Sequence, residues 1–399
     1  MRRWAGRRRL RGFALGVIGL LLVIIGFYGW AWLSTDRSTI ARAVIWTEAD
    51  VGDQDRFPAR SLPAGDQVRS LPVEPEANLR AIADGGRSSL DAFLRDTETR
   101  AFVVLHRDSI VYERYYGPSG QDTLETSFSV AKSFVSTLVG IAIDQGLIGG
   151  VDDPVTRYVP ELAERDPRFA RITLRDLMTM RSGLRYEEAS FPWPWGDDTY
   201  TYYGVDLRDA ALEETEIERA PGQLWHYNNY NPLLLGLVLE RATGTSVADY
   251  MARELWQALG AASNGSWSLD SERSGFEKME SGLNATARDY ARFGLLLLHH
   301  GRWKGDQVVS QGWVRDATAA QTTTPYAKPY GYFWWLDGQR PGRFYAFGNY
   351  GQYIYVDPLA DAVIVRLGGD WGVGNENWLA VFRDVIDQLA GSPGVYPER

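Results

Sequence analysis

Hydrophobic and polar positions divide the chain into an apolar run near the N-terminus, a polar stretch and a long patterned body. Phe13–Leu33 is dominated by Leu, Ile, Val, Gly and aromatic residues, and no charged residue occurs from position 12 to position 35. This run reaches the length of about 20 apolar residues with which a helix crosses a bilayer. Residues 34–75 mix Pro, Asp, Arg and Ser without a sustained period, which is typical of a tether or of an extended strap over the body.

The first part of the body combines a helical pattern with a pair of strand patterns. Apolar residues recur near helical spacing over residues 76–96, which predicts an amphipathic helix. Ala101–His106 and Ser109–Tyr115 are rich in β-forming residues, and the Arg107-Asp108 pair between them indicates a hairpin. Ser129–Gly146 is apolar on nearly every side, so we expect a buried helix there.

Helical patterns continue from about residue 150 to residue 300, and strand patterns return near the C-terminus. The clearest helices in this part are Leu233–Arg241, Val247–Leu259, Ala285–His300 and, at the end of the chain, Asn377–Leu389. The predicted strands are Arg343–Ala346, Gln352–Asp357 and Asp361–Leu367. The order predicts an α+β fold over residues 76–399, in which N- and C-terminal helices flank an antiparallel sheet and a mostly helical lobe is inserted.

Charge and composition exclude several classes of function. Removing the six arginines of residues 1–11 from the formal net charge of −9 leaves −15 for the rest of the chain. An acidic body of this kind argues against nucleic acid or an anionic membrane as the main partner of the folded domain. The chain has no cysteine, so a thiol nucleophile, a disulfide and a Cys-ligated metal are impossible. None of the four histidines stands in a metal-ligand spacing, and we expect no metal and no cofactor.

The N-terminus indicates a membrane location. A cleaved signal peptide is the alternative, but it would have a shorter apolar region and a small-residue cleavage site. Tyr28, Trp30 and Trp32 stand at that place instead, and such residues are typical of a membrane interface. We therefore expect a cytoplasmic basic segment over 1–11 and a single transmembrane anchor over 12–33 in the inner membrane. By the positive-inside rule, the body then lies in the periplasm or outside the cell.

Candidate chemistry begins with a lysine that stands out from the composition. The chain has 42 Lys and Arg residues but only four lysines, and one of them is Lys132, three residues after Ser129. Arginine stays protonated, whereas a buried lysine can lose its proton and act as a base. A serine in the first turn of a helix also lies near free backbone N–H groups, which would stabilise a negative oxygen. The alternative is a Ser129 that only caps the helix, with Lys132 extending from it.

A second candidate, Tyr227-Asn228-Asn229, lies on a loop before the helix at Leu233. A phenol near a cation can carry a proton, and the Asn229 amide can bind a substrate or the lysine. The alternative is a turn followed by a core aromatic residue. Further upstream, the aromatic residues of 191–195 and 200–203 could line a substrate pocket or pack within the helical lobe.

The third candidate is the segment from Gly348 to Gln352, which enters the last strands. Glycine at a strand start permits close approach of a ligand, and a backbone N–H there could be a second oxyanion donor. Asn349, Gly351 and Gln352 are therefore candidate substrate-binding residues, together with Asn229. The alternative is an ordinary bulge or turn.

In this order, the three motifs resemble those of the serine β-lactamase and penicillin-binding-protein superfamily. The Tyr-x-Asn form is similar to the class C β-lactamase-related branch, with its family VIII esterases, DD-peptidases and 6-aminohexanoate-dimer hydrolases. The resemblance extends over residues 76–390 and implies a β-lactamase-like fold. It also implies Ser129 as nucleophile, Lys132 as base and Tyr227 as proton shuttle.

One position departs from the lactamase pattern. Lactamases carry Lys-Thr-Gly at the third motif, where this chain has Asn349-Tyr350-Gly351 and therefore no cation for the carboxylate of a β-lactam. The expected function is hydrolysis of a small-molecule ester, amide or peptide through an acyl-enzyme on Ser129. A β-lactamase or DD-peptidase acting on cell-wall-type substrates, and a non-catalytic ligand-binding protein of the same fold, are the alternatives.

Overall fold

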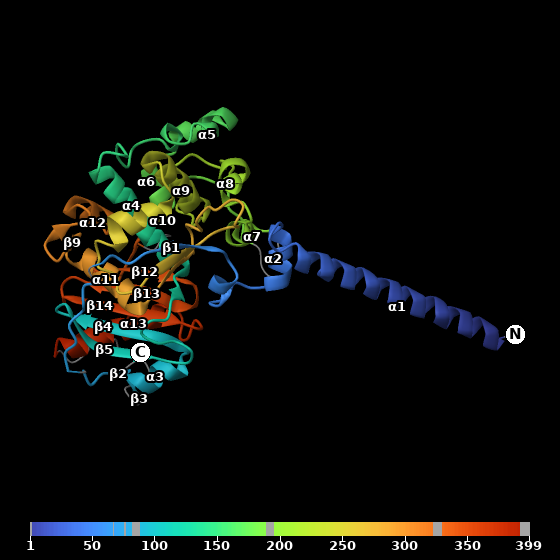
Figure 1. Ribbon diagram of the computed structural model, residues 1–399, viewed down its shortest axis with the longest axis horizontal. Coiled ribbons are helices and arrows are strands. Elements are labelled where there is room, and N and C mark those ends of the chain that lie inside the picture. The colour runs from blue at the N-terminus through green and yellow to red at the C-terminus, as the bar shows by residue number, and fades with distance from the viewer. Residues whose placement is uncertain are drawn as a thin grey trace.

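A six-stranded antiparallel sheet forms the centre of the body (Figure 1). The computed structural model describes residues 2–66, 68–75, 77–81, 88–188, 195–321 and 329–391. The strand order is β11-β12-β13-β14-β4-β5, with β4 at Thr99–His106, β5 at Ser109–Tyr115, β11 at Trp335–Leu336, β12 at Phe344–Gly348, β13 at Gln352–Asp357 and β14 at Ala362–Gly368. Because β14 pairs with β4, the two ends of the sequence meet in the middle of the sheet. The predicted antiparallel sheet is confirmed.

Local sequence explains the tight turn between β4 and β5. Arg107 and Asp108 have φ values of 51° and 64°, and two consecutive left-handed residues form the turn whose twist suits a hairpin. The predicted hairpin is therefore confirmed.

Helices cover both faces of the sheet. α3 (Leu90–Asp96) and α13 (Asn375–Leu389) bury Phe93, Trp378 and Phe382 against one face. α11 (Ala287–Leu298) packs on the other face, where a Cβ at Gly294 would lie 2.5 Å from Val363 Cγ1. The absence of a side chain at position 294 therefore lets α11 approach β14 closely.

The inserted lobe is mostly helical, as predicted. Its helices are α4 (Ala131–Asp144), α5 (Glu161–Arg165), α6 (Leu174–Met178), α7 (Asp197–Tyr203), α8 (Leu207–Asp209), α9 (Tyr230–Thr243) and α10 (Val247–Met251). The buried helix predicted from Ser129 is α4, preceded by a 3-10 turn at Phe128–Val130. The helix predicted to reach Leu259 changes at Ala252–Trp256 into a π-helical turn. α12 (Gln311–Ala317) and the short pair β9 (Arg302–Trp303) and β10 (Asp306–Gln307) follow α11.

The helix predicted over residues 76–96 is wrong where its first part is described. Within the described residues of this range, 77–81 and 88–96, only α3 is helical, and β2 (Arg80–Ala81) pairs with β3 (Ser88–Ser89) before it. Ser89 accepts a hydrogen bond from Ala92 N, so it begins the helix as an N-cap. Residues 82–87 lie outside the described residues.

The polar stretch after the apolar run packs on the body. It forms α2 (Thr39–Trp46) and β1 (Ala59–Leu62), and β1 joins a second sheet in the order β1-β7-β8-β6. The other strands of that sheet are β6 (Glu125–Thr126), β7 (Gly265–Ser268) and β8 (Leu283–Ala285). Of the two expectations for residues 34–75, the strap describes this part of the chain.

The apolar run forms the end of a long helix that projects from the body (Figure 1). α1 extends over Arg2–Leu33, and its Leu15–Leu33 portion is long and apolar enough to cross a membrane. Almost none of that portion is buried against the body. A signal sequence near an N-terminus can pass the same test of length and composition, so α1 is a candidate membrane span and no more.

Candidate active site

Ser129 lies in a strained turn between β6 and α4. The residue before it, Phe128, has a φ of 43°, a left-handed conformation that a bulky residue adopts at an energetic cost. The Phe128 ring is buried, with centroids 6.3 Å from the Tyr202 ring and 5.5 Å from the Tyr350 ring. This aromatic packing holds the backbone in place, and Ser129 itself is partly exposed between buried neighbours.

Lys132 lies directly beside the serine. Its Nζ is 2.8 Å from Ser129 Oγ and 3.0 Å from the backbone carbonyl oxygen of Glu280, and the side chain is buried. The same Nζ lies 4.9 Å from the centroid of the Tyr227 ring. The structure therefore brings the three predicted catalytic residues together.

The ring of Trp335, in β11 at the edge of the six-stranded sheet, packs on the ring of Tyr227. The two rings are stacked with centroids 5.9 Å apart and an interplanar angle of 20°. Trp225, two residues earlier, packs against both Trp335 and Tyr330. The loop that carries Tyr227 is thus fixed by aromatic contacts with β11 and the residues before it.

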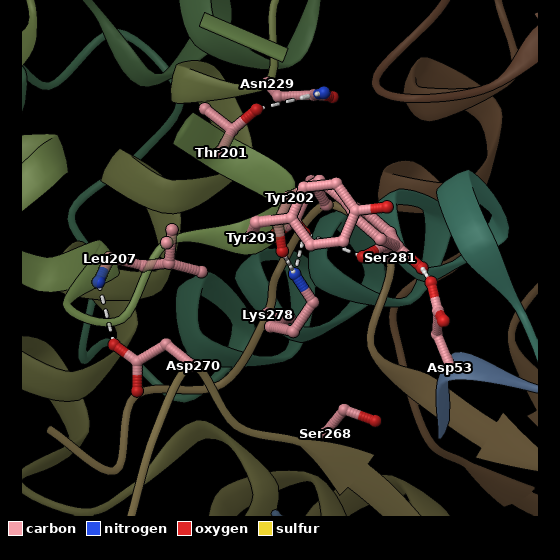
Figure 2. A network of polar contacts seen from close by, with 12 residues as sticks. Asp53, Thr201, Tyr202, Tyr203, Leu207, Asn229, Ser268, Asp270, Lys278 and Ser281 are labelled. Carbon is pink, nitrogen blue, oxygen red and sulfur yellow. Dashed lines mark hydrogen bonds and ion pairs between the residues drawn. The ribbon is translucent and has the colours of Figure 1, made fainter. Parts of the chain in front are cut away.

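Asn229 is turned toward the helical lobe. Its Nδ2 donates to the Tyr186 hydroxyl at 2.8 Å and lies 3.4 Å from Thr201 Oγ1, as Figure 2 shows for Thr201. Its Oδ1 is buried without a hydrogen-bond partner among the described residues. The Asn229 amide nitrogen is therefore used on Tyr186 and on Thr201 of α7, whereas its Oδ1 accepts no hydrogen bond from the described residues.

The C-terminal end of β12, at Gly348, packs directly against the backbone of Ser127 and Ser129. A Cβ at Gly348 would lie 2.4 Å from Ser127 O and 3.0 Å from Ser129 N, so only glycine fits there without a shift. The next residues turn sharply: Tyr350 has a φ of 59° and Gly351 a φ of 75°. Asn349 is exposed at this turn.

A buried arginine, Arg366, stabilises this turn through hydrogen bonds to its carbonyl oxygens. Arg366 Nη1 donates to the carbonyl oxygens of Tyr350 and Gly351 at 3.1 and 2.8 Å, and its guanidinium lies 3.8 Å from the Trp378 ring centroid. Burial lowers the pKa of Arg366 to about 9. Gln352 is also buried, and its amide donates to the carbonyl oxygens of Asn349 and Gly368. Gly351 and Gln352 thus shape the turn, and the Gln352 amide is used on backbone groups.

Sequence reasoning missed Arg366, although a signal for it exists. It is the only charged residue in the apolar run of β14, and a strand covered on both faces offers no solvent for a charge. Such an arginine has to find buried acceptors, and the carbonyls of the turn supply them.

A buried ion pair lies behind Lys132, and sequence reasoning missed it as well. Lys278 Nζ is 2.8 Å from Glu280 Oε1 and also donates to the Tyr202 carbonyl oxygen (Figure 2). Its Nζ lies 4.5 Å from the Tyr202 ring centroid and 4.6 Å from that of Phe57. Burial lowers the pKa of Lys278, and Glu280 opposes that shift. The scarcity of lysine that identified Lys132 applies equally to Lys278.

The strap reaches the same network. Asp53 Oδ2 accepts a hydrogen bond from the Tyr202 hydroxyl at 3.0 Å (Figure 2). Burial raises the pKa of Asp53, while hydrogen bonds from Asp50 N–H and Tyr202 oppose the rise. Tyr202 therefore connects the strap, the buried Lys278 and the Phe128 ring next to the serine. For this half of the aromatic stretch, packing is observed; residues 191–194 lie outside the described residues.

No group of three or more His, Asp or Glu side chains within the described ranges is placed to hold a metal ion. His226 is exposed beside Tyr227 and has its ring centroid 6.3 Å from that of Tyr186. The chemistry available at this site is therefore that of a serine, a lysine and a tyrosine beside two backbone turns.

Comparisons with known proteins agree with this geometry. The profile of the family described as Beta-lactamase matches residues 90–372. The chain is 31% identical over 324 residues to a 6-aminohexanoate-dimer hydrolase from Paenarthrobacter ureafaciens, which covers 75% of this chain and 79% of that protein. It is 32% identical over 188 residues to the esterase EstB from Burkholderia gladioli, covering 43% of this chain and 47% of EstB.

Solved structures show the same fold. A Bacillus anthracis protein assigned as a 6-aminohexanoate-dimer hydrolase superposes with a TM-score of 0.75 and 26% identity, over 85% of this chain and 92% of that one. A class C β-lactamase from Rhodobacter sphaeroides superposes with a TM-score of 0.58 and 20% identity, over 75% of this chain and 97% of that one. The chain therefore belongs to the beta-lactamase family and is a serine hydrolase of that family.

Proposed function

We propose that this protein is a membrane-anchored serine hydrolase that cleaves ester or amide bonds through an acyl-enzyme on Ser129. The observation that carries the proposal is the 2.8 Å distance between Lys132 Nζ and the Oγ of a partly exposed serine. The names of the two relatives above, an amide hydrolase and an esterase, support the choice of bond.

In the proposed reaction, Lys132 accepts the Ser129 proton as Oγ attacks the substrate carbonyl. The negative oxygen that forms is stabilised by the Ser129 N–H and by a backbone N–H of the 349–351 turn, which Gly348 brings close to Ser129. Tyr227 relays the proton from Lys132 to the leaving alcohol or amine, whose bond to the carbonyl carbon breaks. Water then attacks the carbonyl of the acyl-enzyme and gives up a proton, the bond from that carbon to Ser129 Oγ breaks, and Oγ takes up the proton as the acid leaves.

Fluorophosphonate labelling of the full chain tests these roles. Ser129→Ala should abolish the label, and Lys132→Ala and Tyr227→Phe should each slow labelling by ~10²-fold or more, the scale of a lost acid–base group. Lys304→Ala is the matched control, because that lysine is exposed on another part of the surface. A normal rate for Lys132→Ala would show that another group is the base.

Asn349 favours neutral esters and amides over β-lactams. A lactam carboxylate beside a neutral amide forgoes a charge-assisted hydrogen bond of ~1.5–3 kcal/mol, or roughly ten- to a hundredfold in binding. We expect the protein to hydrolyse short esters or amides well ahead of a chromogenic cephalosporin, and Asn349→Lys to shift the ratio toward the cephalosporin. Efficient cephalosporin hydrolysis by the unaltered protein would favour the second candidate, a β-lactamase.

The proposed topology places the body outside the cytoplasm with α1 retained. An alkaline phosphatase fusion after residue 60 should then be active, because that enzyme folds only outside the cytoplasm. A soluble mature protein that begins near residue 34 would contradict the retained anchor.

A further inference from the structure

The C-terminal end of α1, called its foot below, is linked by hydrogen bonds to α7, the helix whose Tyr202 packs beside the residue before Ser129. Thr35, two residues after the end of α1, accepts a hydrogen bond from Arg42 Nε at 2.7 Å. Arg42 Nη1 reaches the carbonyl oxygens of Tyr203 and Gly204, at the end of α7. Figure 1 shows α7 beside α2, next to the point where α1 leaves the body. Any membrane that holds α1 would therefore lie close to α7.

α7 and the strap lead from this foot to the active site. At seven residues, α7 is about 10 Å long. Its Tyr202 ring stacks on Phe128, and Asp197 at its other end accepts a hydrogen bond from Tyr230 at 2.9 Å. On a second path, the Tyr350 hydroxyl donates to the carbonyl oxygen of Ala49 in the strap. Both paths place Ser129 on the side of the body from which α1 departs.

Three exposed apolar side chains belong to segments that contribute to the site or to α7. Leu224 is 44% exposed and stands three residues before Tyr227. Trp371 is 42% exposed and has its ring centroid 5.8 Å from that of Tyr350. Trp195 is 61% exposed, two residues before Asp197. Tryptophan and leucine in this position are typical of a surface that meets the membrane interface.

Four arginines and three acidic residues lie together where α1 meets the body. A cavity of about 830 Å³ there is lined by Arg37, Arg42, Arg56 and Arg273 and by three acidic residues. This local excess of arginine occurs in a chain whose part after residue 11 carries a net charge of −15, from −9 less six arginines. Arg37 follows the apolar span by only four residues, which is the level of lipid phosphates.

We infer that the surface formed by Trp195, Leu224 and Trp371 rests on the bilayer that holds α1, and that the substrate is an amphiphile embedded in that bilayer. Its ester or amide bond lies at headgroup level, within reach of Ser129, while its apolar part stays in the lipid. This inference rests on the proposed hydrolase function and on the anchor, and it adds the source and chemical class of the substrate.

The lack of cysteine allows a direct test of the contact. Single cysteines at Leu224, Trp371 and Leu359 each receive an environment-sensitive nitrobenzoxadiazole dye in the full chain, reconstituted into phosphatidylglycerol–phosphatidylcholine vesicles. Leu359 is the matched control, because it is 75% exposed and lies beyond the far end of β13, about 20 Å from Gln352. We expect blue-shifted emission and quenching by spin-labelled lipid at 224 and 371 and neither at 359. Equal solvent exposure at all three positions would overturn the inference.

A second measurement concerns the substrate. The full chain in the same vesicles is given soluble p-nitrophenyl butyrate or vesicle-embedded p-nitrophenyl palmitate. Leu224→Ser combined with Trp371→Ser should lower the palmitate-to-butyrate rate ratio at least fivefold, whereas Leu359→Ser should leave the ratio unchanged. An unchanged ratio in the double variant, with butyrate still hydrolysed, would overturn the inference alone. Absence of both hydrolysis and fluorophosphonate labelling would instead refute the proposed function, and the dye measurement would still report the contact.

Discussion

The buried pair of Lys278 and Glu280 gives the sharpest prediction for stability. The side chains of both residues are 2% exposed, and Glu280 Oε2 has no hydrogen-bond partner among the described residues. Glu280→Gln keeps the shape of the side chain and removes the charge. Lys278 then remains as a buried ammonium without its carboxylate.

The contacts of Lys278 set the size of the effect. Removing one partner of a buried ion pair costs about 3–5 kcal/mol. Lys278 keeps its bond to the Tyr202 carbonyl and the faces of two rings, so we expect the lower end, about 3 kcal/mol. With an unfolding entropy of about 2.1 cal/mol/K per residue and roughly 360 folded residues, this lowers Tm by about 4 °C.

The loss should also depend on pH in a defined direction. The pKa of folded Lys278 lies below 10.5, its value in the unfolded chain, so unfolded protein binds more protons between those two values. Stability therefore rises with pH through that window. Glu280 raises the Lys278 pKa, so its removal lowers the folded pKa further and widens the window. The deficit of Glu280→Gln should shrink as pH rises from 7 toward 10.

Thermal melts of the full chain in detergent between pH 6 and pH 10 measure this. Lys278→Met combined with Glu280→Gln should recover most of the lost stability at pH 7, because no unpaired charge remains. If Glu280→Gln melts like the unaltered protein at pH 7, or if its deficit is the same at pH 10, the burial of this ion pair has been misjudged.

Two further variants test other parts of the structure. Gly348→Ala places a Cβ 2.4 Å from Ser127 O, so the turn has to move by nearly 1 Å; we expect a ~10²-fold loss in labelling rate. Gly338→Ala is its control, with no atom nearer than Pro329 Cγ at 3.9 Å, and a similar loss there would contradict the argument. Burial, aided by Asp387, raises the pKa of Asp384 to about 6, so its contribution to stability is present below pH 3.8 and is lost as pH rises through 6. Asp384→Asn should thus raise the free energy of unfolding, and with it Tm, at pH 7 and not at pH 3.5; the gain should be no more than ~1 kcal/mol because the group is only partly buried. Equal gains at both pH values would refute the cause.

The sequence predicted the long patterned elements well because their patterns are local. β4, β5, β13, β14, α11 and α13 differ from the predicted ranges by two residues or fewer at each end. The failure at 76–96 has a physical cause: β2 and β3 are two residues each, and their stability comes from contacts with α13 and α3 that no local pattern records. The π-helical turn after α10 likewise leaves the apolar pattern of a helix unchanged.

The candidate site was predictable as far as its spacing is local. Ser129 and Lys132 are three residues apart on one turn, so the sequence alone places them together. Arg366 meets the carbonyls of Tyr350 and Gly351, 16 and 15 residues away, and Lys278 meets the Tyr202 carbonyl 76 residues away. Glu280 is only two residues from Lys278, but the burial of that pair depends on the tertiary fold. Each residue is nevertheless unusual in the sequence. Arg366 is a charge in an apolar strand, and Lys278 is one of only four lysines in a chain whose other basic residues are arginines.

The strap makes long-range contacts with the site that its own sequence pattern does not predict. Residues 39–62 precede the segment that matches the family profile, yet their side chains and carbonyls meet Tyr202 and Tyr350, which pack on either side of Phe128. The contacts of the strap with Tyr202 and Tyr350 do not involve the catalytic residues themselves. Because the strap begins where α1 ends, its contacts link the end of α1 to the aromatic residues that hold the strained turn before Ser129. The path of contacts from α1 to Ser129 is therefore short.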